Sequence, residues 1–245
     1  MKKLFLFFIL SATFLNAGTI NIAVAANVSY AIDELIAEFN KTHKDTKVRV
    51  TLGSSGKLTT QIKHGAPYHL FMAANMKFPQ SLYDDKIAKD APVIYALGSL
   101  AILSKEAKDM SKGIELLKSD EIYKIAIANP KTAPYGTAAM QAFKSAGIYA
   151  DIKDKLIFGE SISQTVSFAI TAADIGLIAK SSLYSKTMLK YKENKNWVEV
   201  DAKLYTPIEQ GIVMIEDNKD TKAFYDFILS DSAKNIFKKY GYLLP

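Results

Sequence analysis

Short apolar runs that alternate with segments of helical periodicity constrain the fold of this chain more than any other feature of its sequence. The apolar runs lie at residues 20–25, 70–73, 100–103, 125–128, 156–158, 175–179 and 210–215. The segment after the first run has apolar residues at the spacing of one helix face, namely Ile32, Leu35, Ile36 and Phe39. Continuous apolar runs are typical of parallel strands that helices cover on both sides. The pattern therefore predicts an α/β fold with mainly parallel sheet flanked by helices.

The first residues have the pattern of an export signal. Lys2 and Lys3 precede an apolar run at residues 4–10, and the small Ala17 suits the position before a cleavage site. The run is short for a membrane span, which needs about 20 apolar residues, and no later stretch approaches that length. We expect residues 1–17 to be a signal peptide cleaved near Ala17, and the mature chain not to insert into a membrane.

Composition narrows the classes of function. The chain has no cysteine, which excludes disulfides, thiolate metal sites, a cysteine nucleophile and a lipid anchor attached through sulfur. We therefore expect a freely diffusing exported protein, retained in the periplasm by an outer envelope. Removal of Lys2 and Lys3 lowers the net charge from +6 to +4, and the lysines are interleaved with acids. This distribution favours solvated faces over a nucleic-acid surface.

Four predicted strand-to-helix junctions are candidates for a ligand site. They lie at residues 25–29, 53–56, 128–137 and 159–164, and they are rich in Ser, Asn, Gly and Ala. Ligands of open α/β sheets gather outside the carboxyl ends of strands, where helices begin. The histidines, at positions 43, 64 and 69, do not have metal-binding spacing. The junctions therefore predict a site built from neutral groups.

The most informative junction is the turn Gly53-Ser54-Ser55-Gly56, which comes after the strand-like residues 47–51. Two glycines allow a tight turn, and the serines add hydroxyl donors to helix-start N–H groups that have no intrahelical partner. Such a turn favours a small oxyanion. Taken alone, the same four residues also fit an ordinary flexible turn, so the interpretation depends on the residues that come after the turn.

The turn and its continuation resemble the molybdate-binding protein family, the periplasmic receptors of ABC-type molybdate importers. The resemblance covers essentially the whole mature chain. Its most specific piece runs from the Gly-Ser-Ser-Gly turn through Gln61-Ile62 and Gly65-Ala66-Pro67 to residues 70–74. Supporting pieces lie at residues 128–130, 134–136, 174–179, 224–227 and 240–242. The chain departs from the family pattern at His69, where the pattern has an acidic residue, and at Asn129, where it often has Asp.

The resemblance implies a two-lobed periplasmic binding protein fold of type II, with a ligand cleft between the lobes. Lobe 1 is expected to comprise residues 18–98 and 205–245, and lobe 2 residues 99–204. The implied function is capture of molybdate, and also tungstate, for delivery to the membrane permease of an ABC importer. The protein would bind without turnover, as a monomer, with no cofactor and no partner among nucleic acids.

Site residues follow from the same resemblance, position by position. The oxyanion-binding residues are expected to be Asn27, Ser55, Tyr135 and Ile162. Additional candidates are Val28, Ser54, Gly136, Ala179 and Lys180. Ala179 lacks the phenolic hydroxyl that family members place near this position, and Lys180 or Ser181 would have to compensate. Molybdenum or tungsten would arrive as the oxyanion, with no direct metal ligand from the protein.

Two alternatives stay open at the level of sequence. A receptor for another small oxyanion, such as sulfate, would use the same architecture, because one fold serves many ligands. An exported serine hydrolase would use Ser54 or Ser55 as its nucleophile. However, the turn lacks the G-x-S-x-G spacing, and no histidine is clearly placed as a base.

Overall fold

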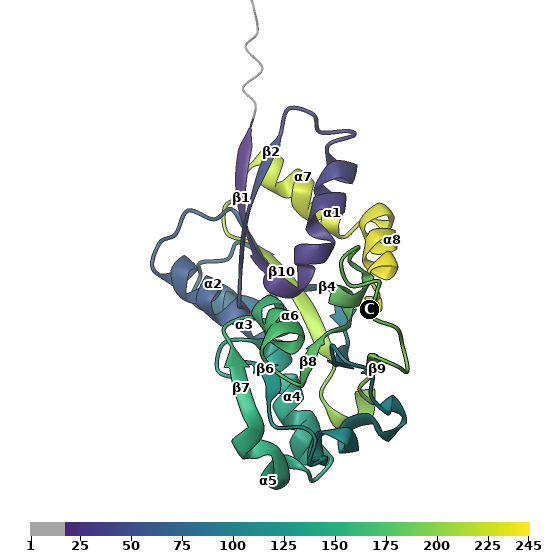
Figure 1. Cartoon of the computed structure of the whole chain (residues 1–245). Coiled ribbons are helices and arrows are strands. Elements are labelled where there is room, and N and C mark those ends of the chain that lie inside the picture. Colours follow the sequence, from purple (N-terminus) through teal and green to yellow (C-terminus); the bar gives the residue numbers. More distant parts are fainter. Residues whose placement is uncertain (1–17) are drawn as a thin grey trace, which may run out of the picture.

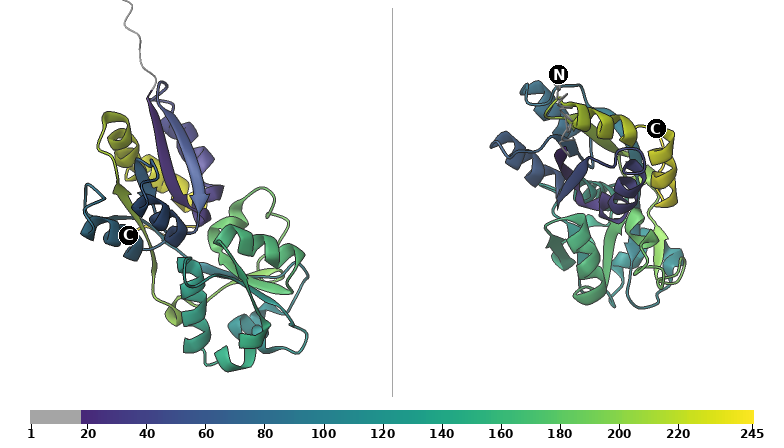
Figure 2. Two further views of the ribbon diagram at one scale, coloured as in Figure 1. Left: turned by 90° about the vertical axis from the view of Figure 1, so that its left-hand side faces the viewer. Right: turned by 90° about the horizontal axis from the view of Figure 1, so that it is seen from above.

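The computed structural model describes residues 18–245, which form two α/β lobes (Figure 1, Figure 2). The signal peptide expected at residues 1–17 lies outside the described residues. From residue 18 to residue 245, no helix is both long and apolar enough to cross a membrane. Each lobe is organised around its own five-stranded sheet.

The upper lobe of Figure 1 is built on a sheet with the strand order β2-β1-β3-β10-β4. Its strands are β1 (Thr19–Ala25), β2 (Lys47–Gly53), β3 (Leu70–Met72), β4 (Val93–Gly98) and β10 (Ile208–Met214). β1 is parallel to β2 and β3, whereas β10 is antiparallel to both of its neighbours, β3 and β4. The helices of this lobe are η1 (Ala26–Tyr30), α1 (Ile32–Phe39), α2 (Ser55–Lys63), α3 (Lys77–Asp84), α7 (Lys219–Ile228) and α8 (Asp231–Lys239).

The lower lobe has a sheet with the strand order β7-β6-β8-β5-β9. Its strands are β5 (Leu100–Leu103), β6 (Ile125–Ala128), β7 (Leu156–Gly159), β8 (Ile175–Ala179) and β9 (Trp197–Glu199). β6 is parallel to β7 and β8, whereas β5 is antiparallel to β8 and β9. The helices are η2 (Met110–Lys118), α4 (Pro134–Ser145), α5 (Tyr149–Ile152), η3 (Lys153–Lys155), α6 (Ile162–Thr171), η4 (Lys180–Tyr184) and η5 (Ala202–Leu204).

Two crossing segments join the lobes. The chain leaves the upper sheet at the end of β4 and enters the lower sheet as β5, with Ser99 between them. It returns through η5 and enters the upper sheet as β10. In each sheet, the first strand after a crossing is antiparallel to its neighbours. These two strands are β5 in the lower sheet and β10 in the upper sheet. We propose residues 18–98 and 205–245 as lobe 1, and residues 99–204 as lobe 2.

Side chains of the upper sheet alternate between two cores, as the pleat of a strand requires. Ile22, Val24 and Ile212 face the cluster that includes side chains of α1, α7 and α8. Ala23 and Val213 face the opposite cluster, which includes side chains of α2 and α3. The sheet is thus covered by helices on both faces, and the fold class expected from the sequence is confirmed in both lobes.

All seven apolar runs noted in the sequence overlap strands of the structure. Two strands were not predicted, namely β4 and β9. The residues of β4 are apolar, but the strand is only partly buried, since Val93 is exposed and Ile94 is half-buried. The expectation of mainly parallel sheet needs one refinement, because each sheet is mixed through its single reversed strand.

His69 replaces the acidic residue of the family pattern while retaining an acceptor. Its Nδ1 accepts a hydrogen bond of 2.7 Å from the backbone N–H of Asn21 in β1. The proton of the neutral ring must therefore be on Nε2, which faces Glu216 at 3.2 Å. His69 thus provides a side-chain acceptor for β1 directly before β3.

Replacing the His69 imidazole tests this acceptor role. We expect His69→Leu to lower the free energy of unfolding by about 1 kcal/mol, because the part-buried Asn21 N–H would lose its partner. His69→Asn keeps an acceptor oxygen and should lose less. Urea unfolding of both variants is the measurement, with the exposed His64→Leu as a control. Equal losses for the Leu and Asn variants would contradict the acceptor role.

Candidate functional site

A small buried cavity lies between the lobes where the predicted junctions converge. Its volume in the described arrangement is about 10 Å³, close to the space that one water molecule needs. The upper lobe contributes Ala25, Ala26, Asn27, Gly53, Ser54, Ser55 and Ala74, and the lower lobe contributes Ala133, Pro134, Tyr135 and Ile162. This lining contains no lysine, arginine, histidine, aspartate or glutamate. All four residues that the sequence analysis placed first are brought together here.

Three helices begin at the cavity wall. Ser55 is the first residue of α2, Tyr135 the second residue of α4, and Ile162 the first residue of α6. N–H groups in the first turn of a helix have no intrahelical partner and lie at the positive end of the helix dipole. α2 and α4 also have no side-chain cap, since neither Ser54 nor Ala133 accepts a bond from its helix. The N–H groups of Ser55, Tyr135 and Ile162 make no hydrogen bond within the described chain and can serve an anion, whereas the Gly56 N–H is bonded to Thr132 and the Gln164 N–H to the Ser161 cap.

The two serines of the turn add hydroxyl groups. The Ser55 Oγ accepts a hydrogen bond of 2.9 Å from the backbone N–H of Ala74, so its own hydrogen is free to point elsewhere. The Ser54 Oγ is buried and has no hydrogen-bond partner within the described chain. A buried hydroxyl without a partner is costly, and a ligand oxygen in the cavity would satisfy it.

Asn27 lines the cavity, but its side-chain amide is already engaged inside the upper lobe. Its Nδ2 donates to the Oε1 of Gln210 at 2.8 Å and to the hydroxyl of Tyr242 at 2.9 Å. Both amide hydrogens are therefore used, and this geometry does not support the expectation of an amide donor to the ligand. Neither Gln210 nor Tyr242 was named as a site residue from the sequence. The available signals were a glutamine that opens an apolar run and a tyrosine within the closing Tyr-Gly-Tyr motif.

The remaining candidates lie outside the lining. Val28, Gly136, Ala179 and Lys180 are not among the residues that line the cavity. The Lys180 Nζ instead pairs with Glu199 of β9 at 2.5 Å. Lys180 is therefore not placed to replace the phenolic group that is missing at Ala179.

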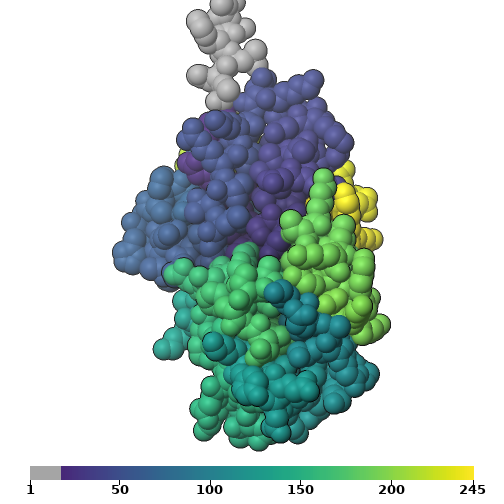
Figure 3. Space-filling model, in the orientation of Figure 1, coloured from purple at the N-terminus to yellow at the C-terminus, as the bar shows by residue number. Residues whose placement is uncertain are grey.

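The two lobes are in contact along a seam (Figure 3). The backbone N–H of Gly56 in α2 donates to the carbonyl of Thr132 in the lower lobe at 2.9 Å. Next to it, Lys57 forms an ion pair with Glu160, again across the seam. Both side chains of this pair are exposed, so the pair adds little stability on its own.

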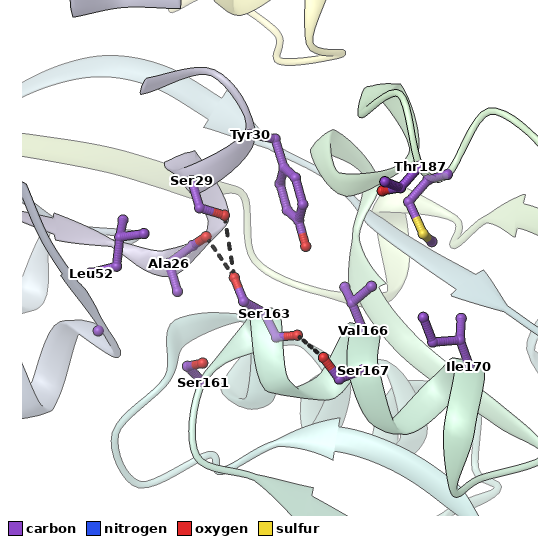
Figure 4. A pocket seen from close by; sticks show the side chains of 12 residues that line it. Ala26, Ser29, Tyr30, Leu52, Ser161, Ser163, Val166, Ser167, Ile170 and Thr187 are labelled. Carbon is purple, nitrogen blue, oxygen red and sulfur yellow. Dashed lines mark hydrogen bonds between the residues drawn. The ribbon is translucent and has the colours of Figure 1, made fainter. Parts of the chain in front are cut away.

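Serine hydroxyls make further bonds across the seam (Figure 4). The Ser163 Oγ of α6 donates to the carbonyl of Ala26 at 2.9 Å and lies 3.4 Å from the Ser29 Oγ. The Ser181 Oγ donates to the carbonyl of Asn27 at 3.0 Å. The bonds to Ala26 and Asn27 end on backbone carbonyls of η1, and the contact with Ser29 joins two side chains, so both kinds of group link the lobes beside the cavity.

Two α/β lobes joined by crossing strands, with a neutral cavity of helix starts buried between them, define a two-lobed solute-binding protein. Residues 20–243 match the family model described as "Bacterial extracellular solute-binding protein", and the chain belongs to this family. The resemblance to molybdate-binding proteins noted in the sequence is confirmed by the similarity of individual relatives.

Several relatives are similar over nearly their whole length. The molybdate-binding protein ModA of Rhodobacter capsulatus is 34% identical, with 93% of this chain and 89% of that protein covered. Its counterpart from Azotobacter vinelandii is 33% identical, with 92% and 90% covered. The solved structure of the Azotobacter vinelandii periplasmic molybdate-binding protein superimposes with a TM-score of 0.84 at 27% identity, over 92% of this chain and 99% of that one.

Gly136 sets how closely α4 approaches the sheet, and this can be tested. A Cβ at this position would overlap the carbonyl oxygen of Ala128 at the end of β6 and lie 2.9 Å from the nitrogen of Pro130. We expect Gly136→Ala to lower the free energy of unfolding by about 1–3 kcal/mol, because backbone atoms cannot move aside cheaply. Urea unfolding of the unliganded protein is the measurement, with Lys131→Ala in the same loop as a control. A loss equal to that of the control would contradict the close approach.

Proposed function

We propose that this chain is a periplasmic receptor that captures molybdate, and also tungstate, and delivers it to the membrane permease of an ABC importer. The names of its relatives and the chemistry of its cavity support this function together. The protein acts as a monomer that binds and releases its ligand without turnover. The export signal at residues 1–17 and the periplasmic location of the Azotobacter vinelandii relative both favour the periplasm.

The observation that supports an oxyanion ligand most strongly is the set of unused donors in the cavity between the lobes. They come from the helix starts at Ser55, Tyr135 and Ile162 and from the hydroxyls of Ser54 and Ser55. Burying a dianion costs its hydration, and each charge-assisted hydrogen bond offsets about 1.5–3 kcal/mol of that cost. A tetrahedral ion has enough oxygens to engage several of these donors at once.

The donor-rich lining also favours anions that carry no proton. Hydrogen phosphate keeps one O–H, which would need an acceptor inside the cavity, and the unpartnered amide acceptor in the lining is the single Oδ1 of Asn27. Molybdate, tungstate and sulfate are fully deprotonated dianions at neutral pH and make no such demand. Sulfate is the closest competitor, and it is smaller than molybdate, so size and donor spacing must provide the discrimination. Tungstate has the shape and charge of molybdate and is included for that reason.

A serine hydrolase is the second candidate, and the placement of the histidines argues against it. The His64 Nδ1 faces the carbonyl of Thr60 within its own helix, and His69 is bonded to Asn21. His43 stacks on Phe39 at the far end of α1. In the part of the chain that the structure describes, none of the three lines the cavity. Ser54 and Ser55 therefore have no general base in reach, and we propose that the protein is not an enzyme.

Anion titration tests the proposed function. Calorimetry on the mature chain should show saturable, one-to-one binding of molybdate and tungstate. Sulfate should bind more weakly, and hydrogen phosphate should give no heat at the same concentrations. Absence of ester hydrolysis under the same conditions is the control for the alternative. Tight sulfate binding without molybdate binding would make the protein a receptor for a different oxyanion.

Removing single hydroxyls tests the donors. We expect Ser54→Ala to weaken molybdate binding by about 1–3 kcal/mol with little change in the unliganded stability, because the Ser54 Oγ makes no bond within the described chain. Ser55→Ala should weaken binding by a similar amount and also lower stability, since the Ala74 N–H would lose its acceptor. Calorimetry and urea unfolding separate the two effects. Ser167→Ala, on the exposed side of α6, is the matched control. If Ser54→Ala binds molybdate as tightly as this control does, Ser54 is not part of the site.

A further inference from the structure

Two buried oxygens from opposite lobes lie without hydrogen-bond partners beside the anion cavity. One is the Oδ1 of Asn27 in the upper lobe, and the other is the hydroxyl of Tyr135 in the lower lobe. Asn27 is 0% exposed and Tyr135 is 1% exposed. Both residues also line the cavity. Unpartnered buried polar groups are costly, so two of them at one seam require an explanation.

The orientation of the Asn27 amide follows from its neighbours. The Gln210 Nε2 donates to the carbonyl of Ile208 at 3.0 Å, which leaves the Gln210 Oε1 as the atom that faces Asn27. The Tyr242 hydroxyl donates to the Asn27 carbonyl at 2.9 Å, so it accepts rather than donates at the Asn27 side chain. Both neighbours therefore require the Nδ2 of Asn27. The Oδ1 is left as an acceptor that nothing in the upper lobe satisfies.

The Tyr135 hydroxyl is the complementary donor. Complete burial raises its pKa well above the ordinary value for tyrosine. The phenol thus keeps its proton under all physiological conditions. A protonated phenol needs an acceptor, and the Asn27 Oδ1 is an unpartnered acceptor of a residue that lines the same cavity.

Gly98 makes room for this phenol. A Cβ at Gly98 would overlap the Tyr135 hydroxyl and would lie 2.9 Å from the Gln210 Nε2. Gly98 does not have a positive φ, so its backbone does not require glycine. Space for a side chain from the other lobe is therefore the reason for glycine here. Gly98 is also the last residue of β4, directly before the first crossing between the lobes.

We propose that, when the lobes close on the anion, the Tyr135 hydroxyl donates to the Asn27 Oδ1 above Gly98, so that two residues of the binding cavity also lock the lobes together. The inference rests on the proposed function. Opening the lobes separates the lower-lobe phenol from the upper-lobe amide and breaks the bond. The bond therefore forms only in the closed state and adds to the apparent affinity, as any interaction unique to the binding-competent state does.

Tyr135→Phe is the main test, because it removes the donor and keeps the backbone N–H at the start of α4. We expect molybdate affinity measured by calorimetry to fall about 3- to 10-fold, the loss of one hydrogen bond. Ligand-induced compaction, measured by small-angle X-ray scattering, should also decrease. Tyr95→Phe is the matched control, since the buried Tyr95 hydroxyl also has no partner within the described chain but belongs to the upper lobe. Its affinity should equal that of the wild type.

Gly98→Ala tests the clearance independently. We expect it to reduce affinity at least as much as Tyr135→Phe, because the added methyl obstructs the phenol. The double variant Gly98→Ala with Tyr135→Phe should bind more tightly than Gly98→Ala alone, since the overlapping hydroxyl is gone. Recovery is expected to be partial, because the Gln210 Nε2 still lies close to the added methyl. A role confined to folding would show no such recovery, and urea unfolding of each variant checks that the unliganded protein is intact.

The outcomes separate the two proposals. If the wild type binds no molybdate, the proposed function and the lock both fail. If the wild type binds molybdate but Tyr135→Phe matches it in affinity and compaction, the lock fails and the function stands. If Tyr95→Phe loses as much affinity as Tyr135→Phe, the assignment of Asn27 as the acceptor is overturned. A loss confined to Tyr135→Phe and Gly98→Ala, with recovery in the double variant, supports the lock.

Discussion

Buried hydrogen-bond donors need partners, and this protein concentrates several unused donors in one cavity between its lobes. Two sheets direct three helices so that α2, α4 and α6 all begin at the same place. Neither Ser54 nor Ala133 caps its own helix, so the shortage of partners is built into the local structure. A small anion supplies the missing acceptors. The unused donors therefore favour binding of an anion, without any lysine or arginine in the cavity wall.

The two lobes share one arrangement of strands. Each has parallel strands at its centre and one reversed strand, and each reversed strand is the one that a crossing segment feeds. The bonds across the seam end largely on backbone atoms, such as the Gly56 N–H and the carbonyls of Ala26 and Asn27. A backbone N–H or carbonyl group offers the same hydrogen-bonding chemistry whichever side chain its residue has. The geometry of closure is thus set by the positions of η1 and α2 rather than by charged pairs on the surface.

Much of this could be predicted from the sequence, because the relevant signals are local. Apolar runs identify most strands, and the Gly-Ser-Ser-Gly turn identifies a helix start with free donors. Gln210, Tyr242 and Gly98 could not be assigned in this way, since their roles depend on contacts between segments far apart in the chain. The partners of the Asn27 side chain could not be predicted for the same reason. A local pattern shows an amide after a strand, but the residues that use its hydrogens are 183 and 215 positions away.

The position of β10 has a consequence for the order in which the chain can fold. β10 lies between β3 and β4, so the upper sheet stays split until residues 208–214 have been synthesised. The lower sheet, by contrast, uses one uninterrupted stretch from β5 to β9. Nearly the whole polypeptide must therefore emerge before lobe 1 can close its core. Such late completion is compatible with the export that we propose for this chain, in which the polypeptide would cross a membrane in an extended form before folding.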